Sequence, residues 1–364
     1  MKAGIGRYLQ EVLRQRAFCS GALRIDLFAH RPLDWPDCPH TQHIAERKRG
    51  LSWYLYQSHR AINGCDLNVF WAAQNLLPLG LSNRLPCVTT LHDCVHKSGL
   101  AYAPSWMHHW IHRILIPKTL RQSARILTVS RYVAEEILSY HPTYGSKIEV
   151  TPLGVSSAFL REHLNEDEVG AAIKRQGIRQ PYVLGLGTLE PRKNLTTLLR
   201  AFAQLPGQVR TRYQLVLVGK AGWGVDSLSR QLQRMPSNTQ VRLTGYVPDQ
   251  DLPYLYAGAE TFIFPSHYEG FGLPVLEAMA AGCPVISSNG GALPEVVGSA
   301  GVMLPSGAAP EEWSRAMLNL LSSREQRQEL RAAGLLRARL FSWDKCAEVT
   351  FEVIHSLAKS GKNQ

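Results

Sequence analysis

The chain has 364 residues, of which 45% are hydrophobic and 19% are charged. This length and apolar content suit about two folded domains and exclude a mainly disordered chain. The net charge is +11, and residues 1–150 supply +8 of it (18 basic minus 10 acidic), which suits a phosphorylated ligand or an anionic membrane surface.

Several other classes of protein are disfavoured by what the sequence lacks. It has no basic helix interleaved with aromatic residues and no zinc-finger spacing, so we expect no nucleic-acid partner. It has no run of 18 apolar residues and no signal-peptide pattern, so we expect a cytoplasmic protein. Its seven cysteines are scattered and odd in number, which favours reduced thiols over a disulfide framework.

Short apolar runs alternate with helical patterns along the chain. Such runs are typical of strands buried on both faces, and strands alternating with helices predict an α/β fold of doubly wound parallel sheets. The predicted strands are Cys87–Leu91, Arg125–Val129, Tyr182–Leu186, Gln214–Val218, Thr261–Phe264 and Pro284–Ser287; the predicted helices include Arg7–Arg16, Tyr132–Tyr140, Leu195–Leu205, Pro274–Ala281 and Glu311–Ser322. Turn residues at Thr151–Ser157 interrupt the alternation and predict a domain boundary.

His92 and Asp93 directly follow the predicted strand Cys87–Leu91. Ligands of doubly wound sheets bind at the carboxyl ends of strands, which favours a functional role for His92 over a structural one. His108 and His112 stand four residues apart and invite a zinc interpretation, but no cysteine or carboxylate has matching spacing. We therefore expect no metal.

A basic pair, Arg192 and Lys193, follows the predicted strand Tyr182–Leu186. It is either an anion-binding group or a solvated basic loop. Gly185 and Gly187 form half of a dinucleotide fingerprint, but Glu190 stands at the third glycine position and would repel a pyrophosphate. This disfavours an NAD-dependent oxidoreductase.

The richest constellation follows the predicted strand Thr261–Phe264, where Glu269 and Glu277 stand eight residues apart. Gly270 and Gly272 allow close approach of a ligand to the backbone, and Pro274 suits a first helical turn. A helix N-terminus there would attract anions, and Glu277 would fall in that helix's first turn. The alternative is a helix-capping Glu277 and a solvated Glu269.

This segment resembles the Glu-x7-Glu motif of the retaining glycosyltransferases of family 4, a resemblance that runs from Gly4 to about residue 350. Further matching motifs stand in the family's order, namely Gly4–Tyr8, Leu91–Asp93, Leu127–Ser130, Val150–Val155, Gly185–Asn194, Val218-Gly219, Gly245–Asp249 and Asn289–Glu295. The resemblance implies a GT-B fold of two Rossmann-like domains facing a cleft. It also implies an acceptor-side domain over residues 1–155, a nucleotide-sugar domain over 156–340, and a helix over 341–364 that returns to the first domain.

The resemblance also implies roles for individual residues. Glu269 would contact hydroxyls of the donor sugar and Glu277 the ribose, while Arg192 and Lys193 hold the diphosphate. The family's first basic residue is replaced by Thr188, which leaves Arg192 to share that role. His92 completes the expected catalytic set; the other expected donor contacts are Gly4, Gly6, Gly187, Thr188, Val247, Gly270, Phe271, Gly272 and Leu273, and Asp93 and Ser130 are expected on the acceptor side.

By this resemblance the chain is expected to move a hexose, with mannose from GDP-mannose leading, to a glycan or lipid-linked acceptor in cell-surface polysaccharide synthesis. No cofactor is expected, and peripheral attachment to an anionic membrane fits the basic N-terminal half. An epimerase of the same fold and an inactive sugar-binding relative are the alternatives. Family members place a buried strand before the loop at Gly4, so we expect Met1 to be a misplaced or truncated start.

Overall fold

The computed structural model describes residues 4–29, 40–44, 50–94, 106–220, 222 and 226–360. The chain divides into two compact units: an N-terminal unit (Lys2–Gly154 with Ser342–Gln364) and a C-terminal unit (Val155–Phe341). The division after Gly154 falls inside the turn-rich stretch Thr151–Ser157. Every strand pairing described is parallel, which confirms the expected fold class.

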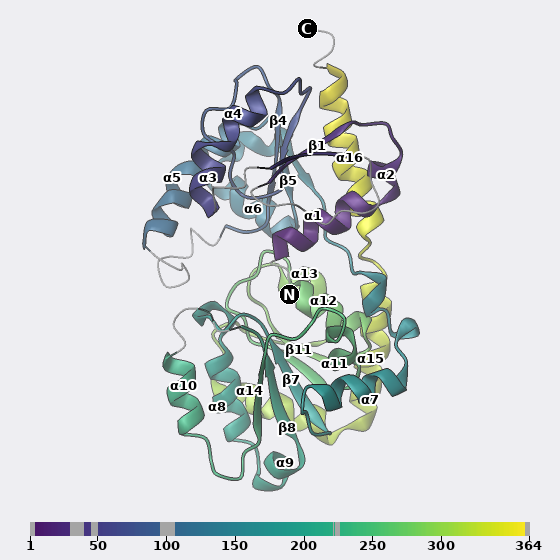
Figure 1. Cartoon of the computed structure of the whole chain (residues 1–364). Coiled ribbons are helices and arrows are strands. Elements are labelled where there is room, and N and C mark those ends of the chain that lie inside the picture. The colour runs from purple at the N-terminus through teal and green to yellow at the C-terminus, as the bar shows by residue number, and fades with distance from the viewer. Residues whose placement is uncertain are drawn as a thin grey trace. The chain divides into compact units, whose positions relative to one another are not determined.

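The N-terminal unit contains two parallel sheets, β1-β2 and β3-β4-β5-β6. Its last helix, α16, belongs to the end of the chain and packs against α1 and α2 (Figure 1). The strands are β1 (Ile25–Ala29), β2 (His40–Ile44), β3 (Phe70–Ala72), β4 (Cys87–Leu91), β5 (Arg125–Thr128) and β6 (Ile148–Val150); the helices are α1 (Gly4–Arg14), α2 (Arg16–Cys19), α3 (Gly50–Tyr56), α4 (Ser58–Asn63), α5 (Trp106–Gln122), α6 (Arg131–Tyr140), the 3₁₀ helix η3 (Pro142–Lys147) and α16 (Trp343–Ser360).

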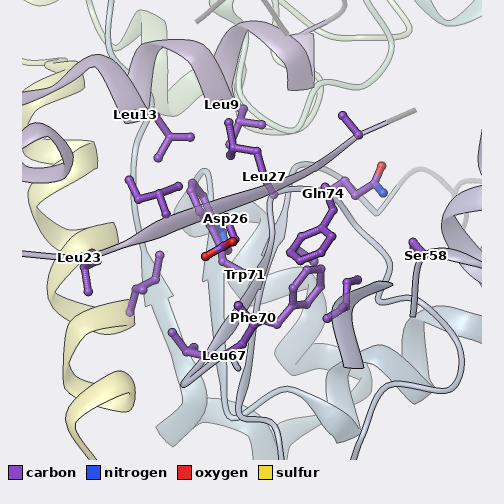
Figure 2. Close-up of a pocket in the computed structure, with 18 of the residues that line it drawn as sticks. Leu9, Leu13, Leu23, Asp26, Leu27, Ser58, Leu67, Phe70, Trp71 and Gln74 are labelled. Carbon is purple, nitrogen blue, oxygen red and sulfur yellow. The ribbon is translucent and has the colours of Figure 1, made fainter. Parts of the chain in front are cut away.

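A cavity of about 600 Å³ lies between α1, β1 and β3 of this unit. Its walls are mainly apolar, with Leu9 and Leu13 from α1, Leu27 from β1, and Phe70 and Trp71 from β3 (Figure 2). Among the described strands, β1 pairs only with β2 and β3 only with β4. The two strands that border the cavity therefore each present an edge without a partner strand. Met1, the subject of our expectation of a displaced start, lies outside the described residues.

An engineered apolar strand of about five residues, added ahead of Met1, is expected to enter this cavity and to raise the melting temperature by at least about 5 °C. The added strand would bury apolar side chains and pair with the open edges of β1 and β3. Differential scanning calorimetry should compare it with a glycine-serine extension of equal length. Equal melting temperatures for the two extensions would contradict the prediction.

The C-terminal unit is built around one six-stranded sheet with the order β12-β11-β10-β7-β8-β9. The strands are β7 (Tyr182–Leu186), β8 (Gln214–Val218), β9 (Val241–Gly245), β10 (Thr261–Phe264), β11 (Val285–Ser288) and β12 (Val302–Leu304); the helices are η4 (Ser157–Phe159), η5 (Arg161–His163), α7 (Glu166–Arg175), η6 (Pro191–Lys193), α8 (Leu195–Ala203), α9 (Gly207–Arg212), α10 (Asp226–Gln233), α11 (Leu252–Ala257), α12 (Leu273–Ala280), α13 (Leu293–Val297), α14 (Pro310–Ser322) and α15 (Arg324–Ala338).

The predicted buried strands form the centre of this sheet. All residues of β7, β10 and β11 are buried, as expected for strands covered on both faces. On one face, Phe202 of α8 and Trp313 of α14 belong to a single apolar core and are fully buried. The direct parallel pairing of β10 with β7 places the carboxyl ends of these two strands side by side.

Candidate active site

The strand order of the C-terminal unit reverses between β7 and β10. The chain moves outward from β7 through β8 to β9 and then returns to place β10 on the other side of β7. In doubly wound sheets, ligands bind beyond the carboxyl ends of the strands at such a switch point. Here the two loops that leave those ends are Gly187–Lys193 after β7 and Pro265–Glu269 after β10.

A cluster of charged side chains joins these two loops. Glu269 accepts from the Lys193 Nζ at 2.6 Å through Oε1, and its Oε2 lies 3.0 Å from Arg192 Nη1. Arg192 also donates to Glu190 Oε1 at 2.9 Å and to the Tyr268 carbonyl at 2.7 Å. With two cations and two carboxylates, the cluster is formally neutral. We call Glu190, Arg192, Lys193 and Glu269 the charge cluster.

The charge cluster is largely removed from solvent. The side chains of Lys193 and Glu269 are 11% and 10% exposed. Burial alone would raise the pKa of the Glu269 carboxyl, but the charges of Arg192 and Lys193 and the hydrogen bonds from Lys193 and Ser266 hold it at about 2. Ser266 donates to Glu269 Oε1 at 2.6 Å. Glu269 is therefore a carboxylate at neutral pH.

Two alternatives considered from the sequence are wrong. Arg192 and Lys193 are not a solvated basic loop, because both are paired with Glu269. Glu269 is not a solvated carboxylate, because it is buried. Lys193 and Glu269 are 76 residues apart in the sequence, yet their side chains meet at the switch point.

Replacing Glu269 by glutamine is expected to lower the free energy of unfolding by about 3 kcal/mol near neutral pH, because two buried cations lose their counter-ion. The pKa of this carboxyl is about 2 in the folded chain and 4.5 without these contacts. The stabilisation is complete above pH about 4.5 and is lost as the pH falls toward about 2. Urea unfolding across that pH range should show the two proteins converging at low pH. A constant difference, or one matched by Glu329→Gln on the exposed side of α15, would contradict the assignment.

Close backbone packing positions Glu269. The Ala292 N–H donates to the Glu269 carbonyl at 2.8 Å. Gly291 has φ +66°, and a Cβ there would lie 2.2 Å from the same carbonyl oxygen, so only glycine fits. The Asn289–Glu295 motif thus supports the loop that carries Glu269.

Helix α12 begins directly after this loop. Gly272 is its N-cap with φ +114°, and Pro274 lies in the first turn, as the sequence indicates. Glu277, however, lies in the second turn, so our placement in the first turn is wrong and the residue cannot cap the helix. It is 2% exposed, and the Tyr256 hydroxyl of α11 donates to its Oε2 at 3.4 Å.

The other predicted donor contacts of this unit lie around the same strand ends. The Gly187 N–H donates to Val218 O, and Thr188 beside it is exposed. Val247 and Phe271 have buried apolar side chains, and Phe271 packs edge-on against Phe341 at 5.7 Å. Gly270 lies two residues before the N-cap of α12, and Leu273 is the first residue of that helix.

In the N-terminal unit, His92 is held in one orientation at the end of β4. Its backbone N–H donates to Asn75 Oδ1 at 2.8 Å, and its ring Nε2 lies 2.9 Å from the Ala73 carbonyl. Because a carbonyl only accepts, Nε2 carries the hydrogen and the neutral ring presents Nδ1 as an acceptor. Burial lowers the pKa of His92, against the opposite influence of the Ala73 carbonyl and Asp93. Tyr8 stacks edge-on against the ring at 4.9 Å.

The other predicted residues of this unit have clear local environments. Asp93 Oδ1 accepts from the Asn75 amide at 3.2 Å. Ser130 is the N-cap of α6 and accepts from the Val133 N–H at 3.2 Å, which is a structural task. Gly4 and Gly6 lie in the first turns of α1, so the expected loop before a helix at Arg7 is wrong there.

Sequence reasoning assigned no role to Ser266, Tyr256 or Asn75. Ser266 lies three residues before Glu269, and this closeness in the sequence could have suggested that the two side chains interact. Tyr256 and Asn75 had no local signal, since their partners are distant in sequence. Within the described part of the chain, no group of three histidine, cysteine or acidic residues could hold a metal ion; His96 lies outside it.

Two protein-family models match the chain. The model described as Glycosyltransferase Family 4 matches residues 28–159, and that described as Glycosyl transferases group 1 matches residues 171–337. O-antigen chain mannosyltransferase B of Escherichia coli is 40% identical over 274 residues, which cover 74% of this chain and 70% of that protein. The chain belongs to glycosyltransferase family 4.

Other proteins similar to this family 4 glycosyltransferase are glycosyltransferases as well. The serotype-specific mannosyltransferase WbdA of Escherichia coli is 30% identical over 282 residues, and this chain spans about a third of its length (34%). Two solved structures share the fold: WaaG, a glycosyltransferase involved in lipopolysaccharide biosynthesis (TM-score 0.74, 16% identity, 96% of each chain), and HepE of Anabaena in complex with UDP and glucose (TM-score 0.75, 18% identity, 98% and 97%). The expected GT-B fold is confirmed, and the expectation of a glycosyltransferase is confirmed over an oxidoreductase.

Proposed function

We propose that this glycosyltransferase transfers mannose from GDP-mannose to a glycan or lipid-linked acceptor during synthesis of a cell-surface polysaccharide. The observation that carries the choice of sugar is the 40% identity with O-antigen chain mannosyltransferase B over most of both chains. We further propose that transfer retains the anomeric configuration and that the enzyme works at the cytoplasmic face of a membrane. The +8 charge of residues 1–150 supports the last point.

Arg192 and Lys193 are proposed to bind the donor diphosphate. Transfer breaks the bond between the sugar and the diphosphate, so negative charge grows on the leaving group while positive charge grows on the sugar ring. A guanidinium and an ammonium that are already held in place stabilise the growing negative charge without reorganisation. Their fixed geometry, with Arg192 bound to the Tyr268 carbonyl and Lys193 against the Phe264 ring at 5.2 Å, supports this role.

Glu269 is proposed to exchange partners when the donor binds. Before binding, its two oxygens are occupied by Lys193 and Arg192. A diphosphate that takes over part of these cations' bonding frees the carboxylate to accept hydrogen bonds from sugar hydroxyls. The low pKa of Glu269 keeps it an acceptor throughout the physiological range.

The remaining donor contacts are proposed around α12. The N–H groups of Gly272 and Leu273 begin this helix, where unpaired backbone donors favour a phosphate. Glu277 is proposed to accept from the ribose hydroxyls, and Gly4, Gly6, Gly187, Thr188, Val247, Gly270 and Phe271 stay proposed as further donor contacts. In the N-terminal unit, we assign His92 to the transferred sugar through its Nδ1 acceptor, and Asp93 and Ser130 to the acceptor side.

The test is a thermal-shift panel of GDP, UDP, ADP and dTDP sugars, followed by product analysis with the donor that binds. A ligand that binds only the folded chain raises the melting temperature by mass action. We expect GDP-mannose to give the largest shift, undiminished by a chelator, and to release GDP slowly. Selective stabilisation by a UDP sugar would overturn the choice of donor. Conversion of the donor sugar without nucleotide release would identify an epimerase, and binding without either reaction an inactive relative.

A further inference from the structure

Helix α5 of the N-terminal unit exposes a broad apolar surface. Trp106, Met107, Trp110 and Ile114 are 71%, 57%, 48% and 64% exposed. Spacings of three and four residues bring side chains to one face of a helix. Both tryptophans that are strongly exposed within the described ranges lie on this helix. A cluster of large exposed apolar side chains on one helix face is typical of a binding surface.

The opposite, inner side of α5 attaches the helix to the rest of the unit. On its inner side, α5 buries His109, Ile116 and Leu120, and its Thr119 hydroxyl accepts from the Leu77 N–H at 3.1 Å. A helix that is apolar on both sides is normally buried all round. Helix α5 is anchored by one side only, so its outer apolar side chains are available for binding.

The charges on the same helix identify the partner. Arg113, Lys118 and Arg121 are exposed, and the helix Trp106–Gln122 contains no acidic residue. The Arg113 guanidinium lies over the Trp110 ring, 5.6 Å from its centroid. Tryptophan rings favour the boundary between headgroups and acyl chains, and basic side chains bind anionic headgroups. No described helix is long and apolar enough to cross a membrane.

We propose that the face of α5 formed by Trp106, Met107, Trp110, Arg113, Ile114 and Lys118 docks on an anionic lipid bilayer. Its tryptophan, methionine and isoleucine side chains enter the headgroup region, and the basic side chains pair with lipid phosphates. This deepens the membrane location in the proposed function and does not depend on which sugar is transferred. A lipid-linked acceptor would then be met at the surface where the N-terminal unit is anchored.

Vesicle co-sedimentation tests the proposal with phosphatidylcholine alone and with about one third phosphatidylglycerol, at roughly 0.1 M and 1 M salt. The whole chain should bind the anionic vesicles on the order of tenfold better, and high salt should remove most of the preference. Trp106→Ser with Trp110→Ser should abolish binding, and Arg113→Gln with Lys118→Gln should abolish only the preference for anionic lipid.

The matched control is Leu336→Ser with Leu340→Ser, which removes two other strongly exposed apolar side chains (66% and 62%) from the C-terminal unit. This control should bind vesicles like the unchanged chain. All variants should keep the melting temperature and the thermal shift caused by the nucleotide-sugar donor, which separates this test from that of the proposed function. Vesicle binding unchanged by the tryptophan double variant would overturn the proposal. A second outcome would also overturn it: the unchanged chain self-associates, the tryptophan double variant is a monomer, and neither protein binds vesicles.

Discussion

Glu269→Gln is expected to lower the turnover number roughly 10- to 150-fold and to leave the Michaelis constant of the donor nearly unchanged. The substitution keeps the side chain's volume but removes a buried charge, 2.6 Å from Lys193 Nζ. If Glu269 binds sugar hydroxyls as the glycosidic bond breaks, its contribution is greatest in the transition state. Steady-state kinetics with the cognate donor measure both constants, at a temperature where calorimetry shows the variant folded.

Glu277→Gln provides the contrast within the same motif. This carboxylate is also buried, and it accepts a hydrogen bond from Tyr256, which lies outside the charge cluster. A ribose contact is the same in the ground and transition states, so the Michaelis constant should rise while turnover changes little. Equal small effects of the two substitutions would mean that neither carboxylate faces the donor.

Lys193→Met is expected to lower kcat/KM by a factor on the order of 10² to 10³, because one positive charge facing the leaving diphosphate is lost. Methionine keeps the length of the buried stem beside Phe264, so packing changes least. The substitution also leaves Glu269 paired with Arg192 at 3.0 Å. Kinetics should be combined with calorimetric titration of a nucleoside diphosphate and of the corresponding nucleoside.

The titration separates a phosphate contact from a general loss of structure. Lys193→Met should weaken binding of the diphosphate and leave binding of the nucleoside intact. The matched control is Lys174→Met on the exposed side of α7, which should change neither. Equal weakening of both ligands by Lys193→Met would assign Lys193 to the fold rather than to the diphosphate.

The sequence by itself determined the parallel α/β fold and the elements that carry the motifs. Runs such as Tyr182–Leu186 and Thr261–Phe264 contain no charged residue and are mostly apolar, which is typical of a strand covered on both faces. Gly272 and Pro274 mark the start of α12 because their backbone preferences are local. Periodicity and backbone preference depend on neighbouring residues, so they can be read along the chain.

Tertiary structure alone decided which side chains of the candidate site contact one another and which are buried. The pairing of Glu269 with Lys193 depends on β10 lying beside β7, a consequence of strand order that local pattern does not contain. The burial of Glu277 against Tyr256 and the link from His92 to Ala73 likewise arise between distant segments. In the sequence, the histidines of α5 suggested a zinc site. In the structure, the notable feature of this helix is the exposure of Trp106 and Trp110. The spacing of apolar residues shows that a helix is apolar on two sides. Only tertiary packing decides which side the rest of the fold covers.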